Sequence, residues 1–93
     1  MEHKPRLGYR IIGTIKRVKG SCSAGHGVGD QIELSGHDTG GLCGFLYHQI
    51  FPYLVMLQFG GGFPSEWGDP DVVEMDCFDK SNVVTIELKR IRE

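Results

Sequence analysis

The stretch Val83-Val-Thr-Ile-Glu-Leu-Lys-Arg-Ile91 decides the fold, because it carries the clearest alternation of apolar and polar residues in the chain. Its apolar members Val84, Ile86 and Leu88 share one side of an extended backbone, and the polar residues between them share the other. This pattern predicts a strand with one face on a core. A turn over residues 79–82 connects it to a second predicted strand, Asp71–Cys77, so the C-terminal part of the chain is expected to be a hairpin.

One helix is predicted before this hairpin, beginning near Leu42 and ending at the glycine run 60–62. Apolar residues recur there at helical spacing, at Leu42, Phe45, Leu46, Ile50 and Tyr53 or Leu54. Asp38 or Thr39 lies where a helix cap is expected. Pro52 lacks a backbone donor and presses against the preceding turn, so we expect a kink or a break into two short helices.

The N-terminal part of the chain predicts another hairpin. Residues 8–19 are rich in β-branched residues and are typical of a long strand, with Gly13 as a bulge or a point of close approach. A glycine-rich loop, Gly20–Gly29, leads to a second strand, Gln31–Leu34. The resulting order, ββαββ, predicts an α+β fold in which the helix covers one face of an antiparallel sheet.

Size and charge limit the classes of function. The 93 residues, 10.3 kDa in mass, have room for a single domain, residues 1–93. The formal charge of −2 gives no general attraction to nucleic acid or to anionic lipid. Residues 1–20 nevertheless carry six cations against one acid, a net charge of +5. We expect these basic positions to face acidic neighbours or solvent, with an anion or RNA surface as the alternative.

The sequence also predicts a cytoplasmic protein. Met1 is followed by charged residues and Pro5, so we expect no secretory signal. The most apolar stretch, Leu42–Phe59, is too interrupted by polar residues and proline to span a membrane. Three cysteines cannot all pair within one chain, which favours a reducing compartment and thiols used for another purpose than disulfides.

Four residues are candidates for a metal centre. Cys22 and His26 stand four residues apart in a glycine-rich loop, where a thiolate about 2.3 Å and an imidazole about 2.0 Å from a zinc ion would be usual. Cys43 lies at the predicted helix start, where the backbone favours a thiolate. Cys77 is predicted on the core side of its strand, so the three sulfurs and one imidazole could converge. The alternative is a set of unrelated buried cysteines.

Other polar residues are not included among the ligands. His48 follows Cys43 by five residues, about 140° around an ideal helix, so the two do not share a face. The acidic residues near the C-terminal hairpin lack the spacing of a calcium loop and are expected to form a solvated edge; they are Asp69, Asp71, Asp76 and Asp79.

Motifs spread over most of the chain resemble one family. They are Cys22-Ser-Ala-Gly-His26, Val28-Gly29-Asp30, Gly41-Leu-Cys43, Tyr47-His48, Pro52-Tyr53, Phe59-Gly-Gly, Phe63-Pro, Asp69-Pro-Asp71 and Cys77. This set resembles a family of small uncharacterised prokaryotic proteins found mainly in anaerobes, with a Cys-x-Ala-Gly-His, Cys and Cys motif set. The resemblance implies that Cys22, His26, Cys43 and Cys77 are the family's motif residues. The chain differs in having Phe78 where the family carries proline.

These observations favour a binding protein over an enzyme, because no residue is identifiable that would orient His26 and a small domain has little wall for a substrate pocket. The leading hypothesis is a Cys3His site that binds zinc or an iron–sulfur cluster. A thiol-based sulfur-handling or redox protein, with Cys22 or Cys43 as nucleophile, is the first alternative. The second is a metal-free homodimer joined through sheet edges or the apolar surface around Tyr53, Phe59, Phe63 and Trp67.

Overall fold

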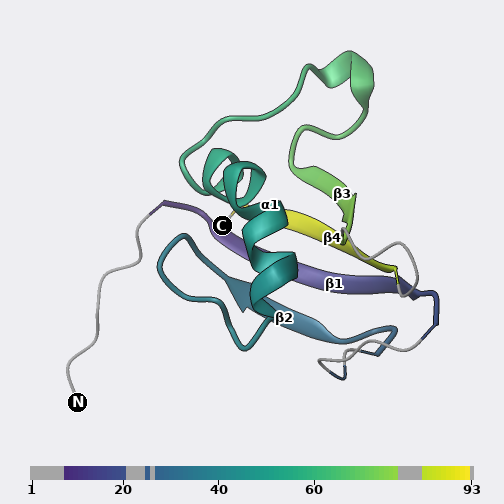
Figure 1. The fold of residues 1–93 in the computed structure, drawn as a ribbon. Coiled ribbons are helices and arrows are strands. Elements are labelled where there is room, and N and C mark those ends of the chain that lie inside the picture. The colour runs from purple at the N-terminus through teal and green to yellow at the C-terminus, as the bar shows by residue number, and fades with distance from the viewer. Residues whose placement is uncertain (1–7, 21–24, 26, 78–82, 93) are drawn as a thin grey trace.

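The predicted ββαββ order is confirmed in a computed structural model, which describes residues 8–20, 25, 27–77 and 83–92 (Figure 1). The elements are β1 (Arg10–Val18), β2 (Gln31–Leu34), α1 (Gly44–Gln58), a short 3-10 helix η1 (Ser65–Trp67), β3 (Val72–Asp76) and β4 (Val84–Ile91). The strands form one antiparallel sheet in the order β2-β1-β4-β3. The long strands β1 and β4 are therefore central, and the two shorter strands are the edges.

The core lies between α1 and one face of this sheet (Figure 1). Val84, Ile86 and Leu88 are buried there, as the alternation in β4 predicts. The core residues contributed by α1 are Leu46, Ile50, Leu54 and Leu57. No helix in the described part of the chain combines the length and apolar composition that a membrane span needs.

The helix begins two residues later than the sequence predicts. Cys43 is its N-cap residue, and neither Asp38 nor Thr39 caps it. The carboxylate of Asp38 instead accepts the Gly40 backbone N–H at 2.9 Å, and the Thr39 hydroxyl accepts the Gly41 N–H at 3.4 Å. These short side chains therefore satisfy backbone N–H groups of the tight turn before the helix. Asp and Thr side chains commonly bond to nearby backbone groups in this way, in competition with helix capping.

Of the kink or break expected at Pro52, the break is wrong, because α1 is one continuous helix from Gly44 to Gln58. A proline removes only one backbone hydrogen bond, and the turns on both sides of Pro52 are held by packing on the sheet. Ile50 and Leu54, which flank it, are both fully buried. Tertiary packing therefore outweighs the local preference of the proline.

Gly13 is the point of close approach that the sequence predicts. A Cβ atom at this position would lie 2.8 Å from Leu34 Cδ1 and 3.0 Å from Ile86 Cδ1. The bulge, the other role considered for Gly13, lies further along β1, where the register to β4 shifts between Ile15 and Arg17. The missing side chain thus lets core residues of both neighbouring strands close over β1.

Candidate functional site

Cys77 follows β3 and remains hydrogen-bonded to the first residue of β4. Its backbone N–H donates to the Val84 carbonyl at 2.8 Å, and its Sγ accepts the Val84 N–H at 3.2 Å. The side chain is half-buried and packs against the core, on the same face as Val73 and Met75, as predicted. The hydrogen bond from the Val84 N–H therefore holds the Cys77 sulfur at the end of β3, where the connection to β4 begins.

Cys43 occupies the N-cap position of α1 and is also half-buried against the core. Its carbonyl accepts the Tyr47 N–H at 2.8 Å, the first hydrogen bond of the helix. The N-terminus of a helix concentrates backbone N–H groups and carries partial positive charge. Cys43 therefore stands at the positive end of the helix dipole.

The glycine-rich loop is anchored on both flanks. Lys19 donates its backbone N–H to the Val83 carbonyl at 2.7 Å, and Gly29 donates to the Ile15 carbonyl at 2.8 Å. The Asp30 carboxylate accepts the Gly27 N–H at 2.9 Å and so closes the turn before β2. Cys22 and His26, the two predicted ligands of this loop, lie outside the described residues.

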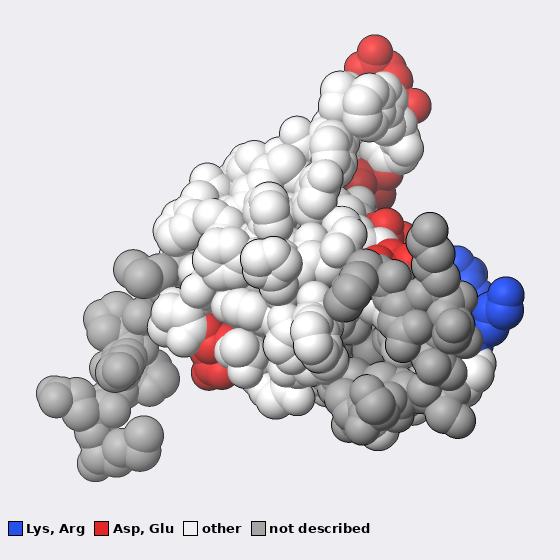
Figure 2. Space-filling view, viewed as in Figure 1, with Lys and Arg blue, Asp and Glu red and all other residues white. Residues whose placement is uncertain are grey.

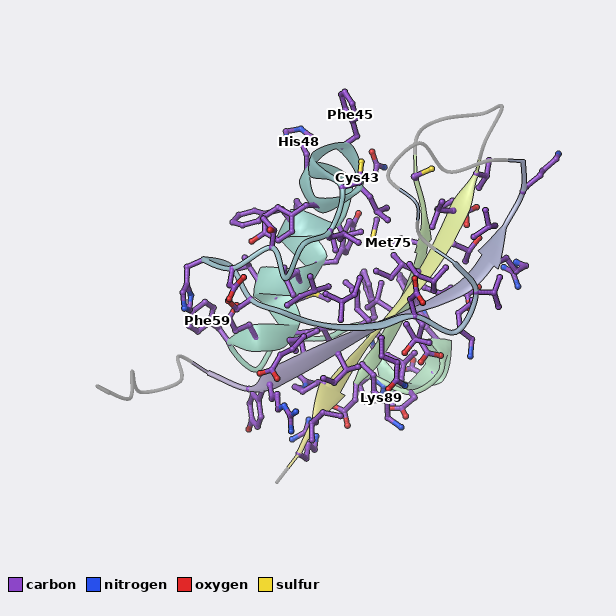
Figure 3. The ribbon with its side chains drawn as sticks, turned by 90° about the horizontal axis from the view of Figure 1, so that it is seen from below. Cys43, Phe45, His48, Phe59, Met75 and Lys89 are labelled. Atoms are coloured by element: carbon purple, nitrogen blue, oxygen red, sulfur yellow. The ribbon has the colours of Figure 1, made fainter. Side chains whose placement is uncertain are left out.

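The anchored segments belong to one end of the sheet. In the antiparallel register Val18 pairs with Val84, and Asp76 pairs with Thr85. The end of β1, the end of β3 and the beginning of β4 are therefore neighbours. Figure 3 places Cys43, at the start of α1, toward this same end of the molecule.

Within the described residues, no three His, Cys, Asp or Glu side chains lie close enough together to hold a metal ion. The predicted set contains only two described members, Cys43 and Cys77. His48 is exposed on the outer side of α1 and points away from the sheet (Figure 3). Cys43 precedes the first residue of α1, whereas His48 lies within the helix.

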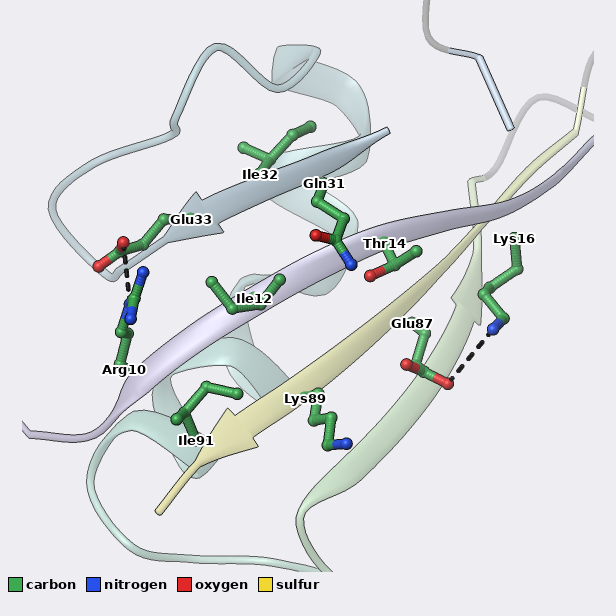
Figure 4. Close-up of a pocket in the computed structure, with 10 residues that line it drawn as sticks. All are labelled: Arg10, Ile12, Thr14, Lys16, Gln31, Ile32, Glu33, Glu87, Lys89 and Ile91. Carbon is green, nitrogen blue, oxygen red and sulfur yellow. Dashed lines mark hydrogen bonds and ion pairs between the residues drawn. The ribbon is translucent and has the colours of Figure 1, made fainter. Parts of the chain in front are cut away.

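The sheet face opposite α1 carries a hollow of about 670 Å³ that the sequence analysis did not identify (Figure 4). Arg10 there pairs with Glu33 at 3.0 Å, and Lys16 pairs with Glu87 at 3.9 Å. Together with an Arg17–Glu74 contact of 3.0 Å, each basic residue of β1 has an acidic neighbour, as expected. The outward-facing positions of the predicted strands were the signal available in the sequence. The hollow itself could not be predicted from them, because it depends on the order in which the strands pair.

Arg90 is a buried cation on the core side of β4, and no sequence pattern predicted its burial. Only 3% of the residue is exposed. Its Nε donates to Asp71 Oδ1 at 2.8 Å, and its Nη1 donates to the carbonyls of Leu57 at 3.0 Å and Gly61 at 2.6 Å. The guanidinium therefore joins the C-terminal end of α1 to the segment before β3.

The described acidic residues that were expected to form a solvated edge lie on or beside the edge strand β3, where Asp69 and Asp76 are exposed, and each of them also has a specific partner. Asp71 binds both Arg90 and Arg92, whose Nε lies 2.9 Å from Asp71 Oδ2. Hydrogen bonds from Arg92, and then from Arg90, hold the pKa of the Asp71 carboxyl below its usual value. Asp76 accepts a 2.5 Å hydrogen bond from the Thr85 hydroxyl, and the Asp69 carboxylate accepts the Asp71 N–H at 2.9 Å. Asp79 lies outside the described residues.

Tyr47 anchors the start of the helix to the end of β2. Its hydroxyl donates to the Ser35 carbonyl at 2.5 Å. Burial, and then the nearby Asp38 carboxylate, raise the pKa of this phenol. The hydroxyl therefore stays protonated at neutral pH and serves as a hydrogen-bond donor.

Comparisons with protein-family models, with curated proteins and with solved structures find no match to this chain.

Proposed function

We propose that this protein is a small metal-binding protein that holds zinc or an iron–sulfur cluster through Cys22, His26, Cys43 and Cys77. The observation that carries the proposal is the hydrogen bond from the Val84 N–H to Cys77 Sγ, 3.2 Å long, at a half-buried position beside the core. Backbone donors to sulfur are typical of the surroundings of metal-bound thiolates, whose charge and potential they adjust.

The position of Cys43 supports the same proposal. It lies at the N-terminus of α1, which favours negative charge, while Cys77 lies beside β4. The two sulfurs thus lie in two different backbone environments, one at the start of the helix and one at the end of β3. Both side chains pack against the same core, so a metal bound to them would be partly shielded from water.

The size of the domain gives such a centre a structural purpose. A chain of 93 residues buries a modest core and leaves a net stability of a few kcal/mol. Metal ligands that come from the β1–β2 loop, the start of α1 and the end of β3 would tie distant parts of the chain together. Binding free energy then contributes directly to folding.

The two candidate metals make different demands on the same residues. Zinc would take all four ligands in a closed tetrahedral site. A [4Fe–4S] cluster would take the three thiolates, with His26 or an outside ligand on the fourth iron. The resemblance to proteins of anaerobes favours the cluster.

The test is metal analysis of the whole protein after purification without oxygen. A cluster gives a brown protein that absorbs near 400 nm. Zinc gives a colourless protein with one metal ion per chain. The proposal is overturned if neither iron nor zinc is present in stoichiometric amount.

Two histidine variants then test the ligand set. His26→Ala is expected to lower the metal content or to change the cluster spectrum, whereas His48→Ala, a control on the outer face of α1, leaves both unchanged. Cys43→Ser and Cys77→Ser are each expected to reduce the metal content further. If His48→Ala removes the metal and His26→Ala retains it, the assignment of ligands is wrong.

If the purified protein contains no metal, the alternative of a thiol-based protein is favoured only if one cysteine is unusually reactive. One cysteine of the three that iodoacetamide modifies much faster than the others at pH 7 would point to an activated nucleophile. Equal and slow modification of all three would argue against that function as well.

A further inference from the structure

The outer side of α1 carries a stripe of residues with the spacing of a helix–helix contact. We call it the outer stripe, and its residues are Phe45, His48, Pro52, Val55 and Phe59. Successive members are three, four, three and four positions apart, which is the a/d spacing of a heptad pattern. Phe59 continues the helical path, because its N–H donates to the Val55 carbonyl at 3.1 Å.

The outer stripe is largely apolar, and all of its residues except the half-buried Val55 are exposed. Phe45 is 69% exposed and Phe59 is 61% exposed, at opposite ends of the helix. Figure 3 shows both side chains on the side of α1 that faces away from the sheet. A helix that is apolar on both its core side and its outer side is typical of a helix covered on both sides.

Among the residues that the structure describes, no charged side chain belongs to this surface. The sequence from Thr39 to Ser65 contains no Asp, Glu, Lys or Arg. Figure 2 shows the consequence, an uncharged area over α1 with acidic side chains only at its margins. By contrast, the open face of the sheet carries residues of both signs, among them Arg10, Glu33 and Lys89.

From this arrangement we infer that the outer stripe is the interface of a homodimer, in which α1 packs antiparallel on α1 of a second copy. An uncharged face can meet its own copy about a two-fold axis without opposing like charges. Nucleic acid and anionic lipid would need Lys or Arg on or beside the stripe, and the described side chains at the margin of the uncharged area over α1 in Figure 2 are acidic instead.

The spacing of the outer stripe fixes the contacts. Its midpoint is Pro52, so an antiparallel two-fold axis there sets Pro52 against the partner's Pro52 and Phe45 against the partner's Phe59. A hollow of about 450 Å³ beside Gly44, His48 and Pro52 lies where the partner's Phe59 would insert.

The exposed area suits a dimer of moderate affinity. Phe45 and Phe59 of the outer stripe are 69% and 61% exposed, and with Phe51, which lies beside the stripe and is 39% exposed, they supply on the order of 300 Å² per subunit. This is more than a third of the roughly 800 Å² that each partner contributes to a standard interface.

Sedimentation of the full chain over a range of concentrations tests the inference. The wild-type protein is expected to sediment at twice its 10.3 kDa mass and to dissociate on dilution. Phe59→Glu buries a charge at the interface and is expected to raise the dimer Kd at least about 30-fold. Pro52→Glu is expected to do the same without loss of helix, since it restores a helical backbone donor.

Trp67→Glu is the matched control, because Trp67 is an aromatic residue that is 75% exposed but lies outside the outer stripe, stacked on Phe63. It is expected to leave the dimer intact. Circular dichroism checks the fold of every variant. Metal content is measured in parallel, and an unchanged content in Phe59→Glu separates this inference from the proposed metal centre.

Three results would overturn the dimer. One is a wild-type protein that stays monomeric up to about 100 μM. This result counts against the dimer also if the monomer binds vesicles of neutral phosphatidylcholine. Another is dissociation by Trp67→Glu while folded Phe59→Glu and Pro52→Glu remain dimeric. The third is a Pro52→Cys protein that, on oxidation, gives no more disulfide-linked dimer than the wild type does.

Discussion

Arg90 shows how one residue can organise several segments. It stands on β4 in a position whose neighbours at two-residue spacing, Ile86 and Leu88, are fully buried. Burial of a cation is unfavourable unless its donors are used, and Arg90 donates to the Asp71 carboxylate and to main-chain carbonyls. The ring of Tyr9, 5.4 Å from its guanidinium carbon, covers it from another side.

Removal of this guanidinium is predicted to be costly. Arg90→Met keeps the bulk of the side chain but leaves the carbonyls of Leu57 and Gly61 without this donor and leaves Asp71 paired with Arg92 alone. The expected loss is about 2–4 kcal/mol of unfolding free energy, measured by urea denaturation. Arg10→Met, which breaks the exposed pair with Glu33, is the control and is expected to cost less than about 1 kcal/mol. Equal losses in the two variants would contradict this role.

The lowered pKa of Asp71 predicts that the free energy of unfolding depends on pH in the acid range. Its pKa is lowered in the folded protein by Arg92 and Arg90, whereas an unfolded Asp titrates at about 3.9. The contribution of the ionised carboxylate is therefore complete above that pH and is lost as the pH falls through the lower, folded pKa. We expect the stability difference between wild type and Asp71→Asn, from urea titrations, to narrow below about pH 4. A constant difference down to pH 2 would show that this carboxyl does not titrate as described.

At the scale of elements, the sheet depends on the close approach at Gly13. Ile86 and Leu34 close over this glycine from the two strands that pair with β1. The helix then needs only to cover a continuous surface of β1, β4 and the edge strands. A side chain at position 13 would have to push these neighbours apart.

Gly13→Val is predicted to destabilise the protein by about 1–3 kcal/mol, because its side chain begins 2.8 Å from Leu34 Cδ1 in a packed core. Gly44→Ala is the matched control, since a Cβ there meets no atom within 4 Å. Alanine in the first turn of α1 is expected to be neutral or to stabilise by up to about 1 kcal/mol. Thermal unfolding of both variants measures the difference. A tolerated valine at position 13 would mean that the strands separate easily.

At the scale of the whole molecule, the proposed metal centre predicts that chelation lowers stability. A ligand that binds only the folded state stabilises it by mass action, so its removal lowers the melting temperature. We expect a chelator to lower the Tm of the wild type by several degrees and to leave the Tm of Cys77→Ser nearly unchanged, measured by scanning calorimetry. An unchanged wild-type Tm, with the metal shown to have been removed, would contradict a structural role.

The sequence alone determined the order and type of the elements, because these depend on the spacing of neighbouring residues. Two patterns are local in this sense, since each involves residues only a few positions apart. They are the alternation of Val84, Ile86 and Leu88 and the helical spacing of Leu46, Ile50 and Leu54. They also fix which face is buried. Cys77 could be assigned to the core side for the same reason.

Only the tertiary structure decided which distant groups meet. The strand order β2-β1-β4-β3, the pairing of Arg90 with Asp71 and the anchoring of Cys77 Sγ by Val84 all depend on contacts between segments. The continuity of α1 through Pro52 does too, because burial on both sides of the proline outweighs the local loss of one hydrogen bond. The local periodicity of a strand or helix determines which of its faces is buried. Only the packing of the whole chain determines which segment lies against that face.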